Sequence, residues 1–416
     1  MNTTTTSRPA AAADTSAATA SREDANAANA ANDAARAEQI EMLRNSALDF
    51  AAGSTDHKRL REQREKLPGY DARLYSAMAD LGWFGILVPE QYGGLGLGLA
   101  EMSVVLQELG KGLLAEPLLA TVVLAGQTLR YGSNEVLKNE LLPKLVDGSL
   151  KACVAWQEDT GGLELMPVQT VAKSEGGRIT LTGRKRFVGG AGNADGYLVT
   201  ARSAAGDGAG VYWVPSGAKG LSVTHEWRAD GTPSGIITLD GVEVAGGHVL
   251  DAPSATALQG LERAVNETCV MAGAETLGVI EATLKMTLEY MRNRVQFGKA
   301  IGTFQALQHR AADLYIQQEL VRAVLGDAVQ TLDSNASAED CSKIASRCKS
   351  RSSEAGLRIT REAIQLHGAI GFTDEYDLGL YVKRALVLSA WLGNSTAHRR
   401  RFALLNAAVW QNGAQG

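Results

Sequence analysis

The sequence predicts an α+β protein in which a small central β-barrel lies between an N-terminal helical domain and a C-terminal four-helix bundle. Two observations support this prediction. Before residue 150 and after residue 251, apolar residues recur every three or four positions, as on one face of an amphipathic helix. Between these regions, apolar and polar residues alternate over short runs bounded by turn residues, which is typical of β-strands.

Length, composition and charge limit the class of protein. The chain has 416 residues, 45% of them hydrophobic, which is enough to bury a large core shared by several domains. The net charge of −5 is modest and no long basic cluster is present, so we expect neither nucleic acid nor membrane as a partner. No apolar stretch has membrane-spanning length, and the four cysteines are scattered. We therefore expect a cytoplasmic protein with buried thiols and no metal site.

Residues 1–36 are expected to form a disordered tail. Ala, Thr, Ser and Asn dominate this segment, and it offers no apolar run whose burial would offset the entropy lost on ordering. An organellar transit peptide is the alternative, because Arg8, Arg22 and Arg36 punctuate the segment. The acidic residues in it argue against that alternative, since transit peptides avoid acids.

Residues 37–150 show a helical pattern and form the predicted N-terminal domain. Ile40, Leu43 and Ala47 fall at positions i, i+3 and i+7. The glycine-rich stretch around Pro89 breaks this pattern and is predicted to be a packed connecting loop.

Residues 151–250 alternate between apolar and polar positions and form the predicted β domain. Ile179 and Leu181 are separated by threonine, and further short runs follow at residues 197–201, 211–214 and 235–239. Several short strands at near-regular spacing are typical of a small barrel or sandwich.

Residues 251–412 return to helical spacing and form the predicted bundle. One long helix is indicated by apolar residues spaced 3, 4, 4 and 3 apart, and three more apolar faces follow. The long helix is marked by Leu277, Ile280, Leu284, Leu288 and Met291, and the later faces begin near Phe304, Ile344 and Phe402.

Two glycine-bearing motifs lie in this last region. The run from Gln365 to Tyr376 reads Gln-Leu-His-Gly-Ala-Ile-Gly-Phe-Thr-Asp-Glu-Tyr, and its glycines let the backbone turn sharply or approach a ligand closely. The run from Tyr290 to Leu314 contains Gln-Phe-Gly and Phe-Gln-x-x-Gln-His. Over roughly residues 38–410 the chain resembles the acyl-CoA dehydrogenase family, flavoproteins that oxidise an acyl-CoA thioester between its α and β carbons. The resemblance implies the fold class predicted above.

The same resemblance implies FAD as cofactor. Arg294 is a fixed cation whose planar guanidinium suits a diphosphate, although without the flanking motifs it would be interpreted as a helix C-terminal charge. By resemblance, Arg294 holds the FAD diphosphate and Phe297 lies against the adenosine. A neighbouring subunit contributes further residues, which implies an oligomer. The other implied contacts are Phe304, Gln305 and Gln308, with Gln365, Gly368 and Ala369 from the neighbouring subunit.

The β domain departs from the usual family pattern. The segment from Lys185 to Asn193 reads Lys-Arg-Phe-Val-Gly-Gly-Ala-Gly-Asn, so Phe187 can stack on the flavin ring but Gly189 supplies no hydroxyl. A backbone N–H of Gly189 or Gly190 is the alternative hydrogen-bond donor. Asn394 and Thr396 are also assigned to the cofactor by resemblance.

These departures resemble the small subunits of bacterial pimeloyl-CoA dehydrogenases and the paired-subunit dehydrogenases of steroid breakdown. The implied partner is a homologous large subunit in a heterotetramer, or a second copy of the chain. Electron-transfer flavoprotein is the possible electron acceptor, and an acyl-CoA is the substrate.

The catalytic base of the family is missing from its usual place. Gap-free reading from Gln365 puts Leu392 at the position of the catalytic glutamate. A minority of the family places the glutamate on the long helix, and counting back from Phe297 puts Thr268 there. Glu267 is its neighbour, but one residue along a helix turns about 100° away.

Three interpretations follow from this absence. The chain is a non-catalytic partner in a heteromer, or it uses Glu267 after a one-residue local shift, or it uses another group. For Glu267 itself the favoured interpretation is a solvent-facing helical acid. We therefore expect the small subunit of an FAD-dependent dehydrogenase for a dicarboxylyl-, cyclic or steroid-derived acyl-CoA. The alternatives are a structural subunit that completes a partner's FAD site, and a flavin monooxygenase-type relative.

Overall fold

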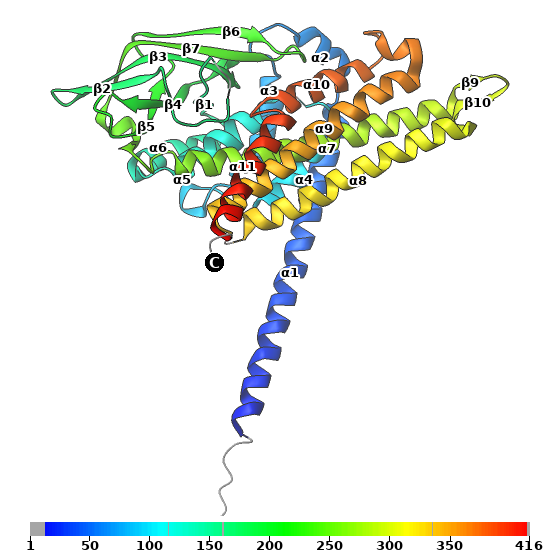
Figure 1. The fold of residues 1–416 in the computed structure, drawn as a ribbon, viewed down its shortest axis with the longest axis horizontal. Helices are drawn as coiled ribbons and strands as arrows, with labels where there is room; N and C mark the ends of the chain where they lie inside the picture. The colour runs from blue at the N-terminus through cyan, green and yellow to red at the C-terminus, as the bar shows by residue number, and fades with distance from the viewer. Residues whose placement is uncertain (1–12, 115, 160–161, 335, 414–416) are drawn as a thin grey trace, which may run out of the picture.

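A computed structural model describes the backbone of residues 13–114, 116–159, 162–334 and 336–413, and within these ranges the side chains of residues 34–407. A helical region, a β-sheet and a second helical region follow one another along the chain (Figure 1). This order confirms the predicted fold class.

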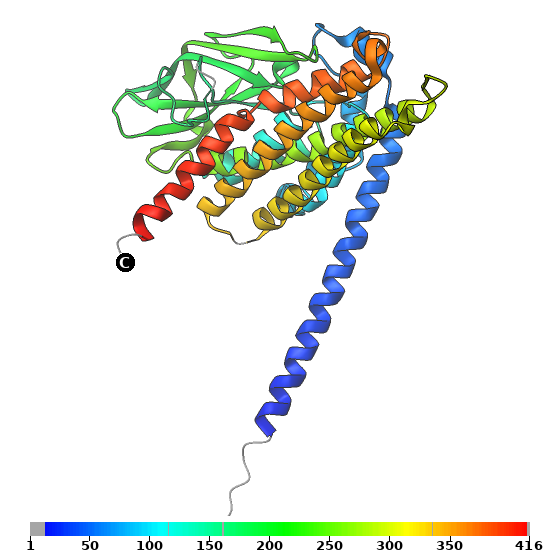
Figure 2. The ribbon, with the colours of Figure 1, turned by 45° about the vertical axis from the view of Figure 1, so that its right-hand side comes forward.

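The first helix, α1 (Ala13–Ser54), corrects the expected disordered tail. Residues 1–12 lie outside the described residues, but from Ala13 the chain is helical, and its first half stands away from the rest of the molecule (Figures 1 and 2). The segment is rich in alanine, the strongest helix former, which favours a helix over a disordered tail. Arg36 fixes the helix where it reaches the body, through ion pairs with Glu101 (2.6 Å) and Asp333 (2.9 Å).

Five further helices complete the N-terminal region together with two short 3-10 turns and one π-helical segment, η3 (Leu119–Ala125). The connecting loop around Pro89 packs its apolar residues inward, since Ile86, Leu87 and Val88 are buried. The helices are α2 (His57–Gln63), α3 (Ala72–Asp80), α4 (Leu99–Lys111), α5 (Gly126–Tyr131) and α6 (Glu135–Val146), and the turns are η1 (Trp83–Gly85) and η2 (Glu90–Tyr92).

The central region is one eight-stranded sheet with the path β6-β7-β3-β2-β4-β5-β8, and β1 pairs with β4. The β1–β4 and β2–β4 pairs are parallel and the other pairs are antiparallel. The strands are β1 (Ala152–Ala155), β2 (Val171–Glu175), β3 (Arg178–Gly189), β4 (Gly196–Ser203), β5 (Ala209–Pro215), β6 (Leu221–Trp227), β7 (Pro233–Val244) and β8 (Val249–Ser254).

The β3–β7 ladder contains an irregularity that shapes the site described below. Lys185 pairs with Ile237 and Val188 pairs with Gly235, so two residues of β3, Arg186 and Phe187, lie opposite a single residue of β7. Such a bulge bends the strand and changes the direction of a side chain. Phe187 accordingly has a left-handed backbone, with φ 58°.

The C-terminal region packs α7, α8, α9 and α10 together, with α11 against α9 (Figure 2). A two-stranded hairpin joins α7 to α8, and the five-residue turn η7 (Gly368–Phe372) follows α9. α10, which the sequence analysis did not separate, lies between the expected third and fourth helices. The elements are α7 (Gln259–Asn293), β9 (Val295–Gln296), β10 (Lys299–Ala300), α8 (Gln305–Asp333), α9 (Ala338–His367), α10 (Leu378–Ala390) and α11 (Ser395–Gly413).

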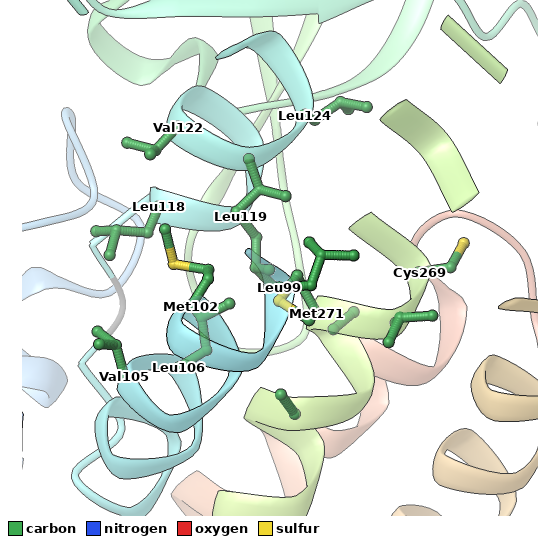
Figure 3. Packing of buried hydrophobic residues seen from close by; sticks show 14 of the residues in the cluster. Leu99, Met102, Val105, Leu106, Leu118, Leu119, Val122, Leu124, Cys269 and Met271 are labelled. Atoms are coloured by element: carbon green, nitrogen blue, oxygen red, sulfur yellow. The ribbon is translucent and has the colours of Figure 1, made fainter. Parts of the chain in front are cut away.

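One large apolar core joins the two helical regions, and a second core lies in the sheet. Figure 3 shows side chains of α4 and η3 packed towards those of α7. The four cysteines are free and buried, as predicted. None of the described helices combines the length and the apolarity needed to cross a bilayer.

Candidate functional site

A cavity of about 370 Å³ lies between the sheet and the C-terminal end of α10. The bulge of β3 contributes Phe187, and the residues after α10 contribute Trp391 and Leu392. β6 and the turn after it add Trp227 and Arg228. The structure therefore brings together two positions selected from the sequence, the ring-stacking Phe187 and the base position Leu392. We refer to this as the flavin cavity, after the ring-stacking role predicted for Phe187 from the sequence.

The segment after α10 is held in an unusual conformation. Leu392 has φ 60° and Gly393 has φ 95°, both in the left-handed region. Nε2 of His398 donates a hydrogen bond to the Leu392 carbonyl (2.8 Å), and the Leu392 side chain is buried. Burial lowers the pKa of His398 to about 3, so the imidazole is neutral and keeps one N–H for this bond.

The flavin cavity contains a single carboxylate among its described lining residues, Glu226. This carboxylate forms an ion pair with Arg186, whose guanidinium also lies over the Phe187 ring at 5.0 Å. The positive charge of Arg186 beside Oε1 therefore favours the ionised form of this carboxylate and weakens it as a base. The sequence analysis did not select Glu226, because an acid in an alternating strand has no distinguishing signal.

Arg228 is the second charged group of the cavity and was also missed. Its Nε donates to Thr232 Oγ1 (2.9 Å), and burial lowers its pKa. Nearby, the Arg384 guanidinium forms ion pairs with Asp230 (2.9 Å) and Glu275 (2.6 Å). With Arg228, this group contains two positive and two negative charges. A guanidinium with free N–H groups in an aromatic cavity suits the polar edge of a planar ligand.

Glu267 lies in a different place from the one expected. The carboxylate is buried, with 1% of the residue exposed, so the interpretation as a solvent-facing acid is wrong. It accepts hydrogen bonds from Tyr131 Oη (2.7 Å), Arg263 Nε (2.6 Å) and Gln127 Nε2 (2.5 Å). It lines another cavity, which shares none of its described lining residues with the flavin cavity. Sequence could not show this burial, because it depends on α5 packing against α7.

Thr268, the alternative base position, supplies no base. Its side chain is buried and its hydroxyl donates to the Ala264 carbonyl (2.6 Å), the usual bond to the preceding helical turn.

Most of the other residues assigned to FAD lie at the far end of α10. Phe297 is at the tip of the β9–β10 hairpin, 91% exposed and with φ 53°. The side chain of Arg294 is exposed, and no described carboxylate lies within ion-pair distance of it. Phe304 packs edge-on against Phe297, with ring centroids 6.3 Å apart, and Gln308 donates to the Gly302 carbonyl (2.9 Å).

The end of α9 packs against the last turns of α7, before this hairpin. The rings of Tyr290 and His367 stack with centroids 4.4 Å apart, which joins the ends of α7 and α9. The exposed residues here are Gln305, Gln365, Gly368 and Ala369, and Gly368 has φ 66°. α10 has 13 residues, so at 1.5 Å per residue this group lies about 20 Å along the helix from Leu392.

Three further residues assigned to the cofactor lie on β3 and at the start of α11. Gly189 pairs with Ser234 in the sheet, and a Cβ there would lie 3.2 Å from Ala120 Cβ and 3.4 Å from the Trp391 ring. Asn394 caps α11, its Oδ1 accepting from the Ala397 amide (2.9 Å). Thr396 is exposed on the first turn of the same helix.

Comparison with known proteins identifies the family. Three family models match the chain: the N-terminal domain of acyl-CoA dehydrogenase over residues 37–149, its middle domain over 153–242 and its C-terminal domain over 259–404. The acyl-CoA dehydrogenase FadE27 of Mycobacterium tuberculosis (strain ATCC 25618 / H37Rv) is 31% identical over 357 residues, covering 84% of this chain and 92% of that protein.

Two solved structures are similar over nearly their whole length. A variant of the Tcur3481–Tcur3483 steroid ACAD superposes with a TM-score of 0.80 at 30% identity, covering 91% of this chain and 99% of that one. The ChsE4–ChsE5 complex from Mycobacterium tuberculosis gives a TM-score of 0.80 at 28% identity, with 89% and 97% covered. The chain therefore belongs to the acyl-CoA dehydrogenase family of FAD-dependent flavoprotein oxidoreductases.

Proposed function

We propose that this chain is the small subunit of a paired-subunit acyl-CoA dehydrogenase and supplies no catalytic base of its own. The observation that supports this is Leu392, an aliphatic side chain in the flavin cavity at the position of the family's glutamate. Abstraction of the α proton of a thioester requires a base within hydrogen-bond reach. The only carboxylate described in that cavity, Glu226, is engaged by Arg186.

FAD supplies the hydride acceptor of this family when it is bound. In this chain, Phe187 and Trp391 place aromatic rings in the wall of one cavity, and Arg228 places a guanidinium there. These residues fit a flavin without a hydroxyl at Gly189. At the other end of α10, Arg294 and Gln365 are exposed and fit the diphosphate and adenosine parts.

The separation of these two groups supports a cofactor shared between subunits. The resemblance divided the hairpin and the end of α9 between subunits, but the two segments lie at the same end of one chain, so we assign both to the neighbouring chain. One chain would offer Phe187 and Trp391 to the ring, and the neighbouring chain would offer these two segments. Exposed apolar side chains at that end, Phe297 and Phe372 among them, are consistent with burial against another chain.

The names of the relatives favour one substrate class. The similar structures include a steroid ACAD and a two-protein complex, so we infer a homologous large subunit as partner and a steroid-derived acyl-CoA as substrate. Dicarboxylyl and cyclic acyl-CoA thioesters remain the other classes in this proposal, and electron-transfer flavoprotein is the proposed acceptor.

A second candidate function is a structural subunit that completes only the partner's FAD site. The packing beside the flavin cavity favours it. Leu119, Ala120, Gly190 and Trp391 leave a space of only about 30 Å³ between η3 and the C-terminal half of α10. An acyl chain would not enter there without displacement of these side chains.

The test is to purify the chain alone and together with the homologous dehydrogenase subunit of the same organism. FAD content per chain and anaerobic bleaching of the flavin by a steroid side-chain acyl-CoA are then measured. We expect bleaching only in the complex. One FAD for each pair of chains favours the structural subunit, and one FAD for each chain favours two flavin sites. A yellow homo-oligomer that the acyl-CoA bleaches would contradict the proposal.

A further inference from the structure

The short helix α2 has a basic face that lies against the loop of residues 373–377, between η7 and α10 (Figure 2). His57, Arg61 and Arg64 are spaced four and three residues apart, so the helix and its C-cap place them on one side. None of the residues in α2 is fully buried, and Leu60 is its partly buried contact with the apolar core. Ionic contacts therefore supply much of the attachment of α2 to the rest of the molecule. We refer to residues 373–377 as the η7–α10 loop.

The partners of this basic face are two aspartates of the η7–α10 loop. Arg64 Nη1 donates to both carboxylate oxygens of Asp374, at 2.8 and 3.0 Å. Arg61 Nε donates to the backbone carbonyl of Asp374 (2.8 Å), and its Nη2 lies 2.8 Å from Oδ1 of Asp377. Nδ1 of His57 lies 2.7 Å from Oδ2 of Asp377. The hydrogen bond from Arg64 lowers the pKa of Asp374, which keeps this carboxylate ionised. The guanidinium of Arg61 therefore joins the two ends of the loop.

The middle of the η7–α10 loop reaches back to the end of α9. The Tyr376 hydroxyl lies 3.2 Å from Nε2 of the buried His367. Nδ1 of His367 donates to the Ala363 carbonyl (2.7 Å), because a carbonyl oxygen only accepts hydrogen bonds. Burial lowers the pKa of His367, so the ring is neutral and its Nε2 accepts from the tyrosine hydroxyl. The loop is thus tied to α2 on one side and to α9 on the other.

The turn η7 lies between these attachments and has few contacts of its own. Ile370 is 42% exposed and Phe372 is 79% exposed, and Gly368 has φ 66°. The five residues of η7 are glycine, alanine, isoleucine, glycine and phenylalanine, none of which has a hydrogen-bonding side chain. The position of η7 therefore depends on α9 before it and on the η7–α10 loop after it.

We propose that Arg61 and Arg64 are positioning residues for the part of FAD that binds at this end of the molecule. The inference rests on the proposed function, in which Gly368 and Ala369 of η7 meet the cofactor. The two arginines fix the η7–α10 loop and, through it, η7. A ligand that binds one arrangement of a turn loses affinity when that arrangement is only partly populated. Because these ion pairs are partly exposed, we expect them to affect FAD affinity more than global stability.

The test compares Arg61→Gln with the unmodified chain in two assays. In the purified chain without flavin, hydrogen–deuterium exchange of the amides of residues 368–377 should become about 3- to 10-fold faster, because a charged hydrogen bond and an ion pair are lost. In the complex with the homologous subunit, FAD affinity should fall by a similar factor, about 3- to 10-fold, measured by flavin fluorescence on dilution. The midpoint of thermal unfolding of the chain should fall by no more than about 2–4 °C.

The matched control is Lys58→Gln on the same helix. The Lys58 side chain is 86% exposed and lies 3.9 Å from Glu62 of α2, so this variant should keep wild-type exchange and FAD affinity. Arg61→Lys keeps one charged donor and should regain part of the FAD affinity that Arg61→Gln loses. If Arg61→Gln does not fold, by circular dichroism, Asp377→Asn takes its place, because it weakens the same ion pair from the side of the loop.

Unchanged exchange of the η7 amides in Arg61→Gln would overturn the inference, whatever the FAD affinity. Faster exchange with unchanged FAD affinity would also overturn it. Arg294→Gln in the same assay separates the two possible failures. If Arg294→Gln lowers FAD affinity and Arg61→Gln does not, FAD binds at this end without the help of α2, and only the positioning role fails. If neither variant lowers FAD affinity, the assignment of FAD to this end fails and the inference fails with it.

Discussion

Phe187 and Leu392 line the same cavity and share the same unusual backbone, with φ values of 58° and 60°. A left-handed conformation costs a residue other than glycine about 1–3 kcal/mol, and such residues cluster at functional sites. The β3 bulge holds Phe187, and the hydrogen bond from His398 holds the turn at Leu392. The chain thus keeps a specific conformation at the base position although the side chain there has no acid–base function.

Leu392→Glu is expected to install the missing base. With excess FAD and acyl-CoA under anaerobic conditions, this variant should reduce flavin about 10²- to 10⁴-fold faster than the unmodified chain, the usual contribution of a positioned general base. The measurement is stopped-flow absorbance of the flavin. Leu392→Gln is the matched control, because glutamine has nearly the shape of glutamate but its amide cannot act as the base. Equal rates of flavin reduction in the two variants would show that the chain lacks other parts of the catalytic site besides the base.

Glu267→Ala is expected to destabilise the chain without affecting flavin chemistry. The change removes a buried carboxylate and leaves Arg263, Tyr131 and Gln127 without their acceptor. Breaking a buried ion pair by removing one partner costs about 3–5 kcal/mol, and the partial exposure of Arg263 places the expected loss near about 3 kcal/mol. Urea unfolding measures this loss in the free energy of unfolding.

The control for this change is Glu140→Ala, which removes an exposed acid paired only with Lys144 and should change stability by less than about 0.5 kcal/mol. If Glu267 were the base after a local shift, Glu267→Ala would instead stop flavin reduction in an active complex at unchanged stability.

The buried Lys349 should make stability rise with pH. Its Nζ donates to the Leu388 carbonyl (2.7 Å) and Ser353 Oγ (3.0 Å), and burial lowers its pKa to about 8 from the usual 10.5. Between these values the unfolded chain holds the proton and the folded chain does not. The unfolded state therefore binds more protons, so the free energy of unfolding increases with pH over this window.

The titration of Lys349 alone should raise the free energy of unfolding by at most about 1.4 kcal/mol per pH unit. Lys349→Met should remove that slope, and urea unfolding from pH 7 to 10 measures the difference from wild type. Lys343→Met, at a more exposed lysine of the same helix that pairs with Glu339, should keep the wild-type slope. A wild-type slope in Lys349→Met would show that the lysine stays protonated when buried.

The sequence predicted the order of the domains because periodicity reports which face of an element is buried. It also selected Phe187 and Leu392, since their positions follow from nearby motifs without gaps. It missed Glu226 and Arg228, which reach the cavity only because β6 pairs with β7 next to α10. It misjudged Glu267, because the donors that bury this acid come from α5, distant in sequence. Contacts between distant segments leave no local pattern, so these residues required the fold.

Arg294→Gln tests the FAD assignment at the far end of α10. The side chain is exposed and has no ion-pair partner among the described residues, so the free energy of unfolding should change by less than about 0.5 kcal/mol. FAD affinity of the assembled complex should nevertheless fall about 10- to 100-fold, because a charge-assisted hydrogen bond to the diphosphate is lost. Flavin fluorescence on dilution measures this affinity. Arg292→Gln is the matched control, two residues earlier on the exposed end of α7, and should retain FAD. Equal FAD affinity in both variants would remove this end of the bundle from the cofactor site and with it the argument for a shared flavin.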